Sequence, residues 1–165
     1  METIYDTLFQ NPAIDPDREC LAYQDRRFSF RELRERTTRL ANALAQLGVG
    51  KGDRVAALLG NCNEFVEAFY AITSLGALIV PLNWRLHPRE HVALMNDCTT
   101  VALISSSEFA ETTEAVRAQV SSVRDIVMVG KTQGTGELSY DDLLASAEDT
   151  PLSASTKASD DAAIA

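Results

Sequence analysis

The chain has 165 residues and a formal net charge of −9 at pH 7, which favours a single domain and argues against a nucleic-acid surface. Hydrophobic residues make up 45% of it and charged residues 24%, as in an ordinary soluble globular protein. The longest uncharged stretch, residues 68–82, is about 15 residues long, too short for the ~20 residues of a membrane-spanning helix.

The cysteines and the N-terminal residues bear on the cellular compartment. Cys20, Cys62 and Cys98 are odd in number, lie far apart and form no CxxC pair, so we expect buried thiols of a reduced compartment. The first residues are acidic and lack the apolar segment of a secretory signal. The sequence therefore predicts a cytoplasmic protein without a transmembrane segment.

The first fifty residues predict a short helix, a hairpin and a long helix. Residues 3–9 form the short helix, and residues 20–23 and 27–28 pair around a turn at 24–26. Ser29 and Glu32 match the S-x-x-E capping box at the start of the long helix. One face of that helix is apolar and carries Phe30, Leu33, Thr37, Leu40, Leu44 and Leu47. On the opposite face we expect i,i+4 ion pairs from Glu32 to Arg36 and from Glu35 to Arg39.

Residues 51–86 are the segment around which the chain is organised. An apolar strand over 55–59 is followed by residues 60–63, which break the strand and supply helix-capping side chains. The helix over 64–75 is apolar on most of its circumference, so we expect it to be buried, with Phe69 and Ile72 in the core. A second apolar strand covers 78–80, and the whole is a βαβ unit of a parallel sheet.

Further strands and helices follow at similar intervals. We expect strands at 101–104 and 126–129 and helices at 88–96, 107–120 and 138–147. A Ser/Thr/Asp-rich linker covers 150–161, and residues 162–165 resemble the opening of another strand. The predicted fold class is α/β, with a mostly parallel sheet flanked by helices.

Three local patterns suggest binding chemistry, but each has a simpler structural explanation. Residues 48–52 are rich in glycine, yet they lie between a helix and a strand, the reverse of a phosphate-binding order. Gly130-Lys131-Thr132 lacks the earlier glycine of a Walker A motif, so a flexible surface loop is expected. His87 and His91 match the H-x-x-E-H spacing of some zinc proteases, but no third ligand is evident. We therefore expect two partly exposed histidines and no metal site.

The segment Asn83-Trp84-Arg85-Leu86 is the strongest candidate site. It leaves the carboxyl end of a predicted parallel strand, where open α/β sheets bind ligands. Asn61 follows another strand end, although helix capping would explain its presence. The alternative for Arg85 is an ion pair with a nearby carboxylate, with Trp84 packed on a surface groove.

The pattern GDRVA…N…EF…AFYAI…GA…VPLN-x-RL, over residues 52–86, resembles the N-terminal part of adenylate-forming enzymes of the acyl-CoA synthetase type. The resemblance implies that residues 1–165 are the N-terminal part of an AMP-binding domain and that the fold is incomplete. The family's phosphate loop, a Thr/Ser/Gly-rich run ending in Lys-Gly, is absent from this sequence, and residues 150–161 would lead into it.

The resemblance also implies a reaction and its cofactors. The complete enzyme would use ATP and Mg to convert a small carboxylic acid, expected to be a fatty acid, into an acyl-adenylate, and would then transfer the acyl group to coenzyme A. An arginine at the position of Arg85 approaches the coenzyme A phosphates in some members, and Trp84 lies beside it in the sequence. No catalytic residue and no metal ligand is carried over to this chain.

Three functional hypotheses remain open at this point. The chain is a fragment of an acyl-CoA synthetase that is inactive alone and binds none of the cofactors tightly. Alternatively, it is a stand-alone flavodoxin-like binding or interaction module, or a truncated product that acts only as a partner. An unfinished sheet would also favour self-association.

Overall fold

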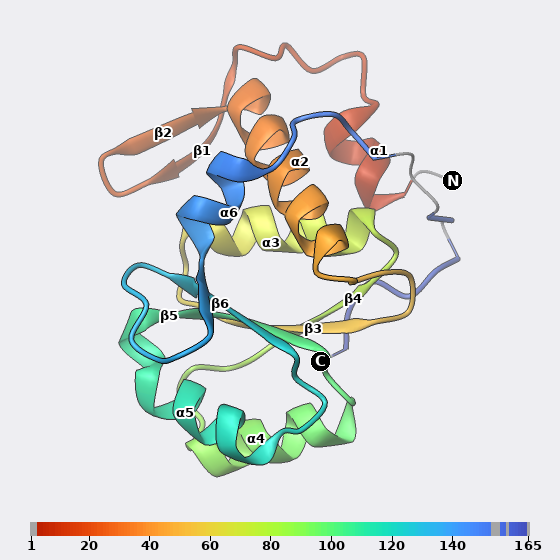
Figure 1. Cartoon of the computed structure of the whole chain (residues 1–165). Coiled ribbons are helices and arrows are strands. Elements are labelled where there is room, and N and C mark those ends of the chain that lie inside the picture. Colours follow the sequence, from red (N-terminus) through yellow and green to blue (C-terminus); the bar gives the residue numbers. More distant parts are fainter. Residues whose placement is uncertain (1–2, 153–155, 158, 165) are drawn as a thin grey trace.

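The computed structural model describes residues 3–152, 156–157 and 159–164, so part of the predicted linker lies outside the described residues. A parallel sheet lies between two layers of helices, and a small hairpin stands at one end of the upper layer (Figure 1). The sheet has five strands in the order β4-β3-β5-β6-β7. The strands are β3 (Arg54–Leu58), β4 (Leu78–Pro81), β5 (Ala102–Ser106), β6 (Asp125–Val129) and β7 (Glu137–Ser139). All four pairings are parallel, which confirms the predicted fold class.

Six α-helices cover the two faces of the sheet within the described residues. On one face lie α2, α3 and α6, with α1 packed against α2 and α3, and on the other face lie α4 and α5 (Figure 1). Their bounds are α1 (Ile4–Phe9), α2 (Phe30–Gln46), α3 (Asn63–Ser74), α4 (Pro88–Asp97), α5 (Ala110–Gln119) and α6 (Tyr140–Ser146). A short 3₁₀ turn, η1 (Ser107–Phe109), precedes α5.

The predicted hairpin is present as β1 (Glu19–Tyr23) and β2 (Arg26–Ser29). Its turn is one residue shorter than predicted, because Arg26 pairs with Tyr23 and Gln24 takes up a positive φ of 50°. The capping box is confirmed: the Ser29 backbone N–H donates to Glu32 Oε2 at 2.7 Å, while Ser29 Oγ accepts from the Glu32 N–H at 3.3 Å.

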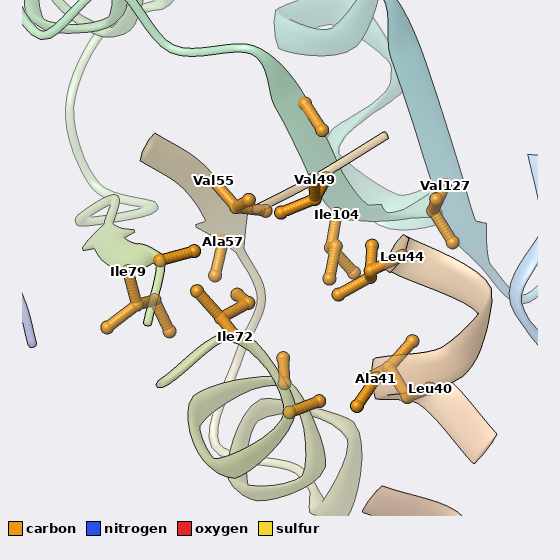
Figure 2. Packing of buried hydrophobic residues seen from close by; sticks show 14 of the residues in the cluster. Leu40, Ala41, Leu44, Val49, Val55, Ala57, Ile72, Ile79, Ile104 and Val127 are labelled. Atoms are coloured by element: carbon orange, nitrogen blue, oxygen red, sulfur yellow. The ribbon is translucent and has the colours of Figure 1, made fainter. Parts of the chain in front are cut away.

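Alternate residues of each strand enter different hydrophobic clusters, which explains why the strands are apolar along their whole length. Val55, Ala57 and Ile104 pack against α2 and α3 (Figure 2). The intervening Ala56 and Leu103 pack toward α4 and α5. A parallel sheet with helices on both faces buries both sides of every strand.

Helix α3 is buried as predicted, but its inward face is smaller than the sequence suggested. Ile72 is fully buried together with Ala68 and Ala71, whereas Phe69 is only partly buried at the margin of the cluster. The large aromatic side chains of this helix therefore cover the edge of the core, and the small ones face its centre.

The C-terminal third of the chain differs from the prediction at one strand. A helix was expected to begin at residue 138, but residues 137–139 form β7 and pair with β6, and α6 begins only at Tyr140. A three-residue strand is too short to show a periodic pattern. The predicted strand opening near residue 162 is confirmed by a parallel bridge between Ile79 and Ala163 at the β4 edge.

A buried carboxylate joins three of the helices on one face. Glu67 of α3 is fully buried, and Arg36 Nε of α2 donates to its Oε1 at 2.8 Å. Asn63 Nδ2 donates to the same oxygen at 2.8 Å, and Tyr140 Oη of α6 donates to Oε2 at 2.7 Å. The predicted Glu32–Arg36 ion pair is therefore wrong, because Glu32 caps α2 and Arg36 turns inward.

The second predicted pair, Glu35 to Arg39, is confirmed at 3.2 Å. The buried network has a further effect on Tyr140. Burial, and then the negative charge of Glu67, raise the pKa of Tyr140 well above its ordinary value, so the phenol keeps its proton and remains a donor.

Replacing Arg36 by methionine tests how much this network contributes to the free energy of unfolding. Arg36→Met keeps an unbranched apolar stem but leaves the buried Glu67 charge without its cation, which we expect to cost ~3–5 kcal/mol, toward the lower end because Arg36 is partly exposed. Arg31→Met, on the same helix, removes a solvent-exposed ion pair with Asp17 and should lower the stability much less. Urea unfolding measures both, and equal costs would show that Glu67 does not depend on Arg36.

Candidate functional site

The winding of the sheet changes direction between β3 and β5. From β3 the chain continues through α3 to β4 on one side, whereas β5 continues through α5 to β6 on the other. Open α/β sheets bind ligands beyond the carboxyl ends of the strands at such a switch point. Gly60 and Glu108 lie beside each other there, since a β-carbon added at Gly60 would be 3.8 Å from Glu108 Oε1.

The turn after β4 is built on Asn83. Its side-chain Oδ1 accepts from the Arg85 backbone N–H at 3.1 Å, and its carbonyl oxygen accepts from the Leu86 N–H at 3.0 Å. The same carbonyl lies 3.0 Å from Nε2 of His91 in α4. An asparagine that bonds to the backbone two residues later is a recognised turn former, so this turn is encoded locally.

The turn presents Trp84 and Arg85 at the carboxyl edge of the sheet. Trp84 is 50% exposed and stacks on Phe109 of η1, with ring centroids 6.5 Å apart and an interplanar angle of 25°. The Arg85 guanidinium lies 5.0 Å from the centre of the Trp84 ring. Among the residues that the structure describes, no carboxylate forms an ion pair with Arg85, contrary to the alternative raised above.

This arrangement combines a planar ring with a cation that has no acidic partner in the described part of the chain. A guanidinium binds phosphate oxygens in a bidentate manner, and an exposed indole stacks on flat ring systems. The structure therefore brings the two predicted site residues together and adds Phe109 to them. A phosphorylated ligand with an aromatic group fits this chemistry.

Asn61 does not have the capping role that the sequence suggested. The cap of α3 is Cys62, which makes no side-chain capping bond, and Asn61 is exposed beside a shallow hollow of about 240 Å³. Burial raises the pKa of the Cys62 thiol to about 11, so the thiol stays protonated near neutral pH. Because the thiolate is the nucleophile, Cys62 is not suited to covalent catalysis there.

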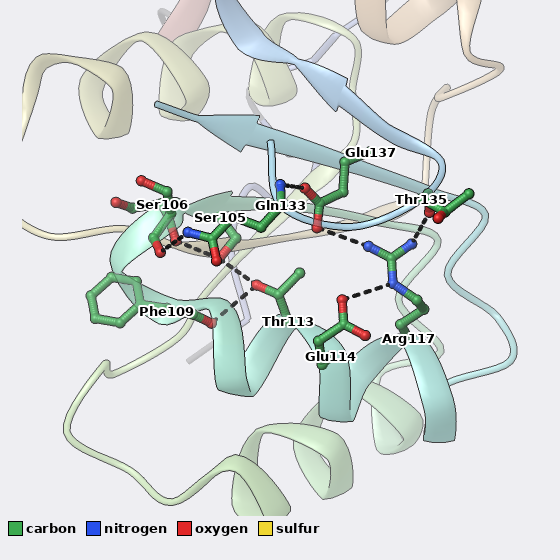
Figure 3. A network of polar contacts seen from close by, with 10 residues as sticks. Ser105, Ser106, Phe109, Thr113, Glu114, Arg117, Gln133, Thr135 and Glu137 are labelled. Carbon is green, nitrogen blue, oxygen red and sulfur yellow. Dashed lines mark hydrogen bonds and ion pairs between the residues drawn. The ribbon is translucent and has the colours of Figure 1, made fainter. Parts of the chain in front are cut away.

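The glycine-rich loop over 130–136 lies at the surface, as predicted, and side chains hold it there. Figure 3 shows Arg117 of α5 between the loop and two carboxylates. Its Nη1 donates to the Thr135 carbonyl at 2.8 Å, and its Nη2 donates to Glu137 Oε1 at 2.9 Å. Glu137 Oε2 accepts from the Gln133 backbone N–H at 2.6 Å.

These contacts change the ionisation of Glu137. Burial alone would raise its pKa, but the backbone N–H groups of Gly134 and Gln133 and the charge of Arg117 outweigh burial and lower it. Two backbone donors of the loop, the N–H groups of Gln133 and Gly134, are thus already engaged by a protein carboxylate. This supports the view that the Gly130-Lys131-Thr132 sequence is not a phosphate loop.

The remaining motifs also have structural roles. His87 caps α4, with its Nδ1 accepting from the Arg89 N–H at 3.2 Å. His91 is buried, not partly exposed as predicted, and the described residues contain no group of three His, Cys, Asp or Glu side chains placed to hold a metal ion. Gly48 and Gly52 have φ of 82° and 83° and form the turn between α2 and β3, as predicted.

Sequence reasoning missed Phe109 and Glu67, and it considered His91 only as a partly exposed residue of a zinc-protease spacing. Phe109 and Glu67 were treated as parts of helix patterns, because their partners Trp84, Arg36 and Tyr140 lie far away in the sequence. Glu67 alone carried a signal, since it is a charged residue within an otherwise apolar helix and such a residue needs a partner when buried.

Comparison with known proteins identifies the family. The model of the family described as AMP-binding enzyme matches residues 8–165. The chain belongs to this family.

Relatives and solved structures agree. The chain is 32% identical over 118 residues to the long-chain-fatty-acid–CoA ligase of Thermus thermophilus, covering 72% of this chain and 22% of that protein. It is 34% identical over 107 residues to the crotonobetaine/carnitine–CoA ligase of Salmonella paratyphi B, covering 64% of this chain and 21% of that protein. The anthranilate CoA ligase AuaEII in complex with anthranoyl-AMP superposes with a TM-score of 0.91 at 30% identity, over 96% of this chain and 31% of that one.

This AMP-binding chain thus spans about a fifth of the length of the curated relatives it matches. Its sheet and helices correspond to the N-terminal part of the adenylate-forming fold. In the described part of the chain, no helix has both the length and the apolar character needed to cross a membrane.

Removing the Glu137 charge tests the anchoring of the glycine-rich loop. Glu137→Gln should lower the free energy of unfolding at pH 7 by ~1.5–3 kcal/mol, because hydrogen bonds to a charged group are lost. A carboxyl with a lowered folded-state pKa stabilises the fold above its ordinary pKa of about 4.3, and that stabilisation disappears as the pH falls through the folded value.

The difference between Glu137→Gln and the unmodified chain should therefore shrink below about pH 4. Glu114→Gln removes an exposed carboxylate from the same Arg117 and is the matched control, with an expected cost under ~1 kcal/mol. Urea unfolding at several pH values gives the result. A constant difference across the acidic range would refute the assignment.

Proposed function

We propose that the AMP-binding chain is part of an acid–CoA ligase that activates a carboxylic acid with ATP and passes the acyl group to coenzyme A. The observation that carries the proposal is the family match over residues 8–165, together with relatives that are themselves acid–CoA ligases. A fatty acid is the substrate class we favour, on the strength of the long-chain-fatty-acid–CoA ligase among them. The three free cysteines support a cytoplasmic enzyme.

The described residues fit some of the implied cofactors and not others. Trp84 and Arg85 suit coenzyme A, because it carries phosphates and an adenine ring, and the guanidinium and the indole would each have a partner. No cluster of acidic side chains or histidines within the described ranges suits Mg. We therefore assign to this chain a contact with coenzyme A and no step of adenylate formation.

The contributions of the two side chains differ. Arg85 would neutralise phosphate charge, and its backbone N–H is fixed by Asn83, so the side chain starts from a defined position. One face of the Trp84 ring stacks on Phe109, so a ligand ring could stack on the opposite face, whose position this contact fixes. Preorganised groups of this kind bind with less loss of conformational entropy.

A stand-alone flavodoxin-like binding module is not favoured. Such a module would bind phosphate at a glycine-rich loop between a strand and a helix. The junctions after β3, β4 and β5 carry no such loop, and the one after β6 leads to a strand, with its Gln133 N–H bound to Glu137.

The coenzyme A contact can be measured directly, because Trp84 is the only tryptophan of the chain. Coenzyme A should change the Trp84 fluorescence saturably, and Arg85→Ala should weaken binding about tenfold or more, as loss of a charge-assisted contact does. Arg27→Ala, an exposed arginine on the hairpin, is the control and should bind as the unmodified chain does. Absence of a saturable change, or equal affinities for all three, would contradict the assignment.

The proposal that this chain binds coenzyme A but does not form the adenylate makes a second prediction. The purified 165-residue chain should not catalyse ATP–pyrophosphate exchange with any carboxylic acid, because the groups for adenylate formation lie elsewhere in the proposed enzyme. Robust exchange, with longer enzyme forms excluded by mass spectrometry, would refute it. Sequencing the DNA after codon 165 tests the ligase assignment itself, and an in-frame Thr/Ser/Gly-rich run ending in Lys-Gly is the expected result.

A further inference from the structure

His91 is a buried polar residue that the proposed function does not use. It lies in the second turn of α4 and is 1% exposed, between the buried apolar residues Val92 and Met95 and the turn after β4. Its Nε2 lies 3.0 Å from the carbonyl oxygen of Asn83. A carbonyl oxygen only accepts, so Nε2 carries the proton and donates.

The other ring nitrogen of His91 makes a histidine energetically unfavourable at this position. Within the described residues, His91 Nδ1 is buried without a hydrogen-bond partner. Burying an unpaired polar atom destabilises a protein, and an apolar side chain of similar size would fill this position without that cost. Packing alone therefore does not account for the imidazole, and its single polar contact is the one to Asn83.

Asn83 is the residue on which the Trp84–Arg85 turn depends. Its oxygens also accept from the backbone of Arg85 and Leu86, and both of these bonds stay within the turn. Among the described residues, the bond from His91 is the side-chain hydrogen bond that links the turn to α4. Without it, the turn could keep its local shape and still rotate relative to the sheet.

We infer that His91 is a positioning residue that holds the Asn83 carbonyl in place. It thereby fixes the position of Trp84 against Phe109 and of Arg85 over the Trp84 ring. Its importance for binding coenzyme A depends on the proposed function, whereas its effect on the turn does not. The inference thus predicts an altered Trp84 environment even when no ligand is present.

The experiment compares two replacements of His91 in the 165-residue chain. His91→Leu removes the donor and the unpaired Nδ1 together, so the urea midpoint should stay the same or rise. His91→Gln retains an N–H donor that can reach the Asn83 carbonyl. Acrylamide quenching and the emission maximum of Trp84 are recorded first without ligand, and coenzyme A is then titrated.

In His91→Leu we expect acrylamide to quench the Trp84 fluorescence more readily. We also expect this variant to bind coenzyme A about two- to tenfold more weakly, as loss of one neutral hydrogen bond implies. His91→Gln should restore both values. If His91 only stabilised the fold, His91→Leu would lower the urea midpoint and leave Trp84 quenching in the folded state unchanged. Should His91→Leu fail to fold, His91→Met provides the donor-free comparison.

The outcomes separate this inference from the proposed function. Unchanged Trp84 quenching in folded His91→Leu, or no rescue by His91→Gln, overturns the positioning role. If quenching responds as expected but the unmodified chain does not bind coenzyme A, the positioning role stands and the assignment of the ligand falls.

Discussion

The arrangement of the helices over one face of the sheet depends on the compensation of one buried charge. Glu67 has no exposed surface, and its two oxygens receive hydrogen bonds from Arg36, Asn63 and Tyr140. A buried carboxylate without partners would cost several kcal/mol, so α2, α3 and α6 must stand where their donors reach it. The apolar cluster beneath them specifies that these helices pack on the sheet, while this network selects how they pack, as a buried polar group with few acceptable partners can do.

This constraint reaches the candidate site through the start of α3. Asn63 is the first residue of that helix and donates to Glu67, so the network fixes where the chain leaves β3 and where the switch point opens. The neighbouring turn is fixed from the other face, through α4 and His91. The carboxyl edge of the sheet is therefore held from both helical layers, which suits a surface that must present side chains in a set orientation.

In our proposal, this edge belongs to a longer enzyme of the AMP-binding family, of which the chain is one part. The described residues offer a cation and a supported aromatic ring, but no acidic cluster for a metal ion. In our proposal such a part binds a phosphorylated cofactor and leaves activation of the acid to other groups. The glycine-rich loop after β6 is a poor phosphate site, because Glu137 already accepts from the backbone N–H groups of Gln133 and Gly134.

Local patterns in the sequence determined most of the fold: the capping box at Ser29, the apolar periods of the strands and helices, and the turn at Asn83. These features depend on residues a few positions apart, and the prominence of Trp84 and Arg85 followed from their place after a strand. Only the tertiary structure decided the partners of Arg36, the burial of His91, the strand at 137–139 and the stacking of Trp84 on Phe109. The physical reason is that each of these is a long-range choice between several chemically acceptable partners, and the choice is made by packing of the whole sheet, which no short stretch of sequence contains.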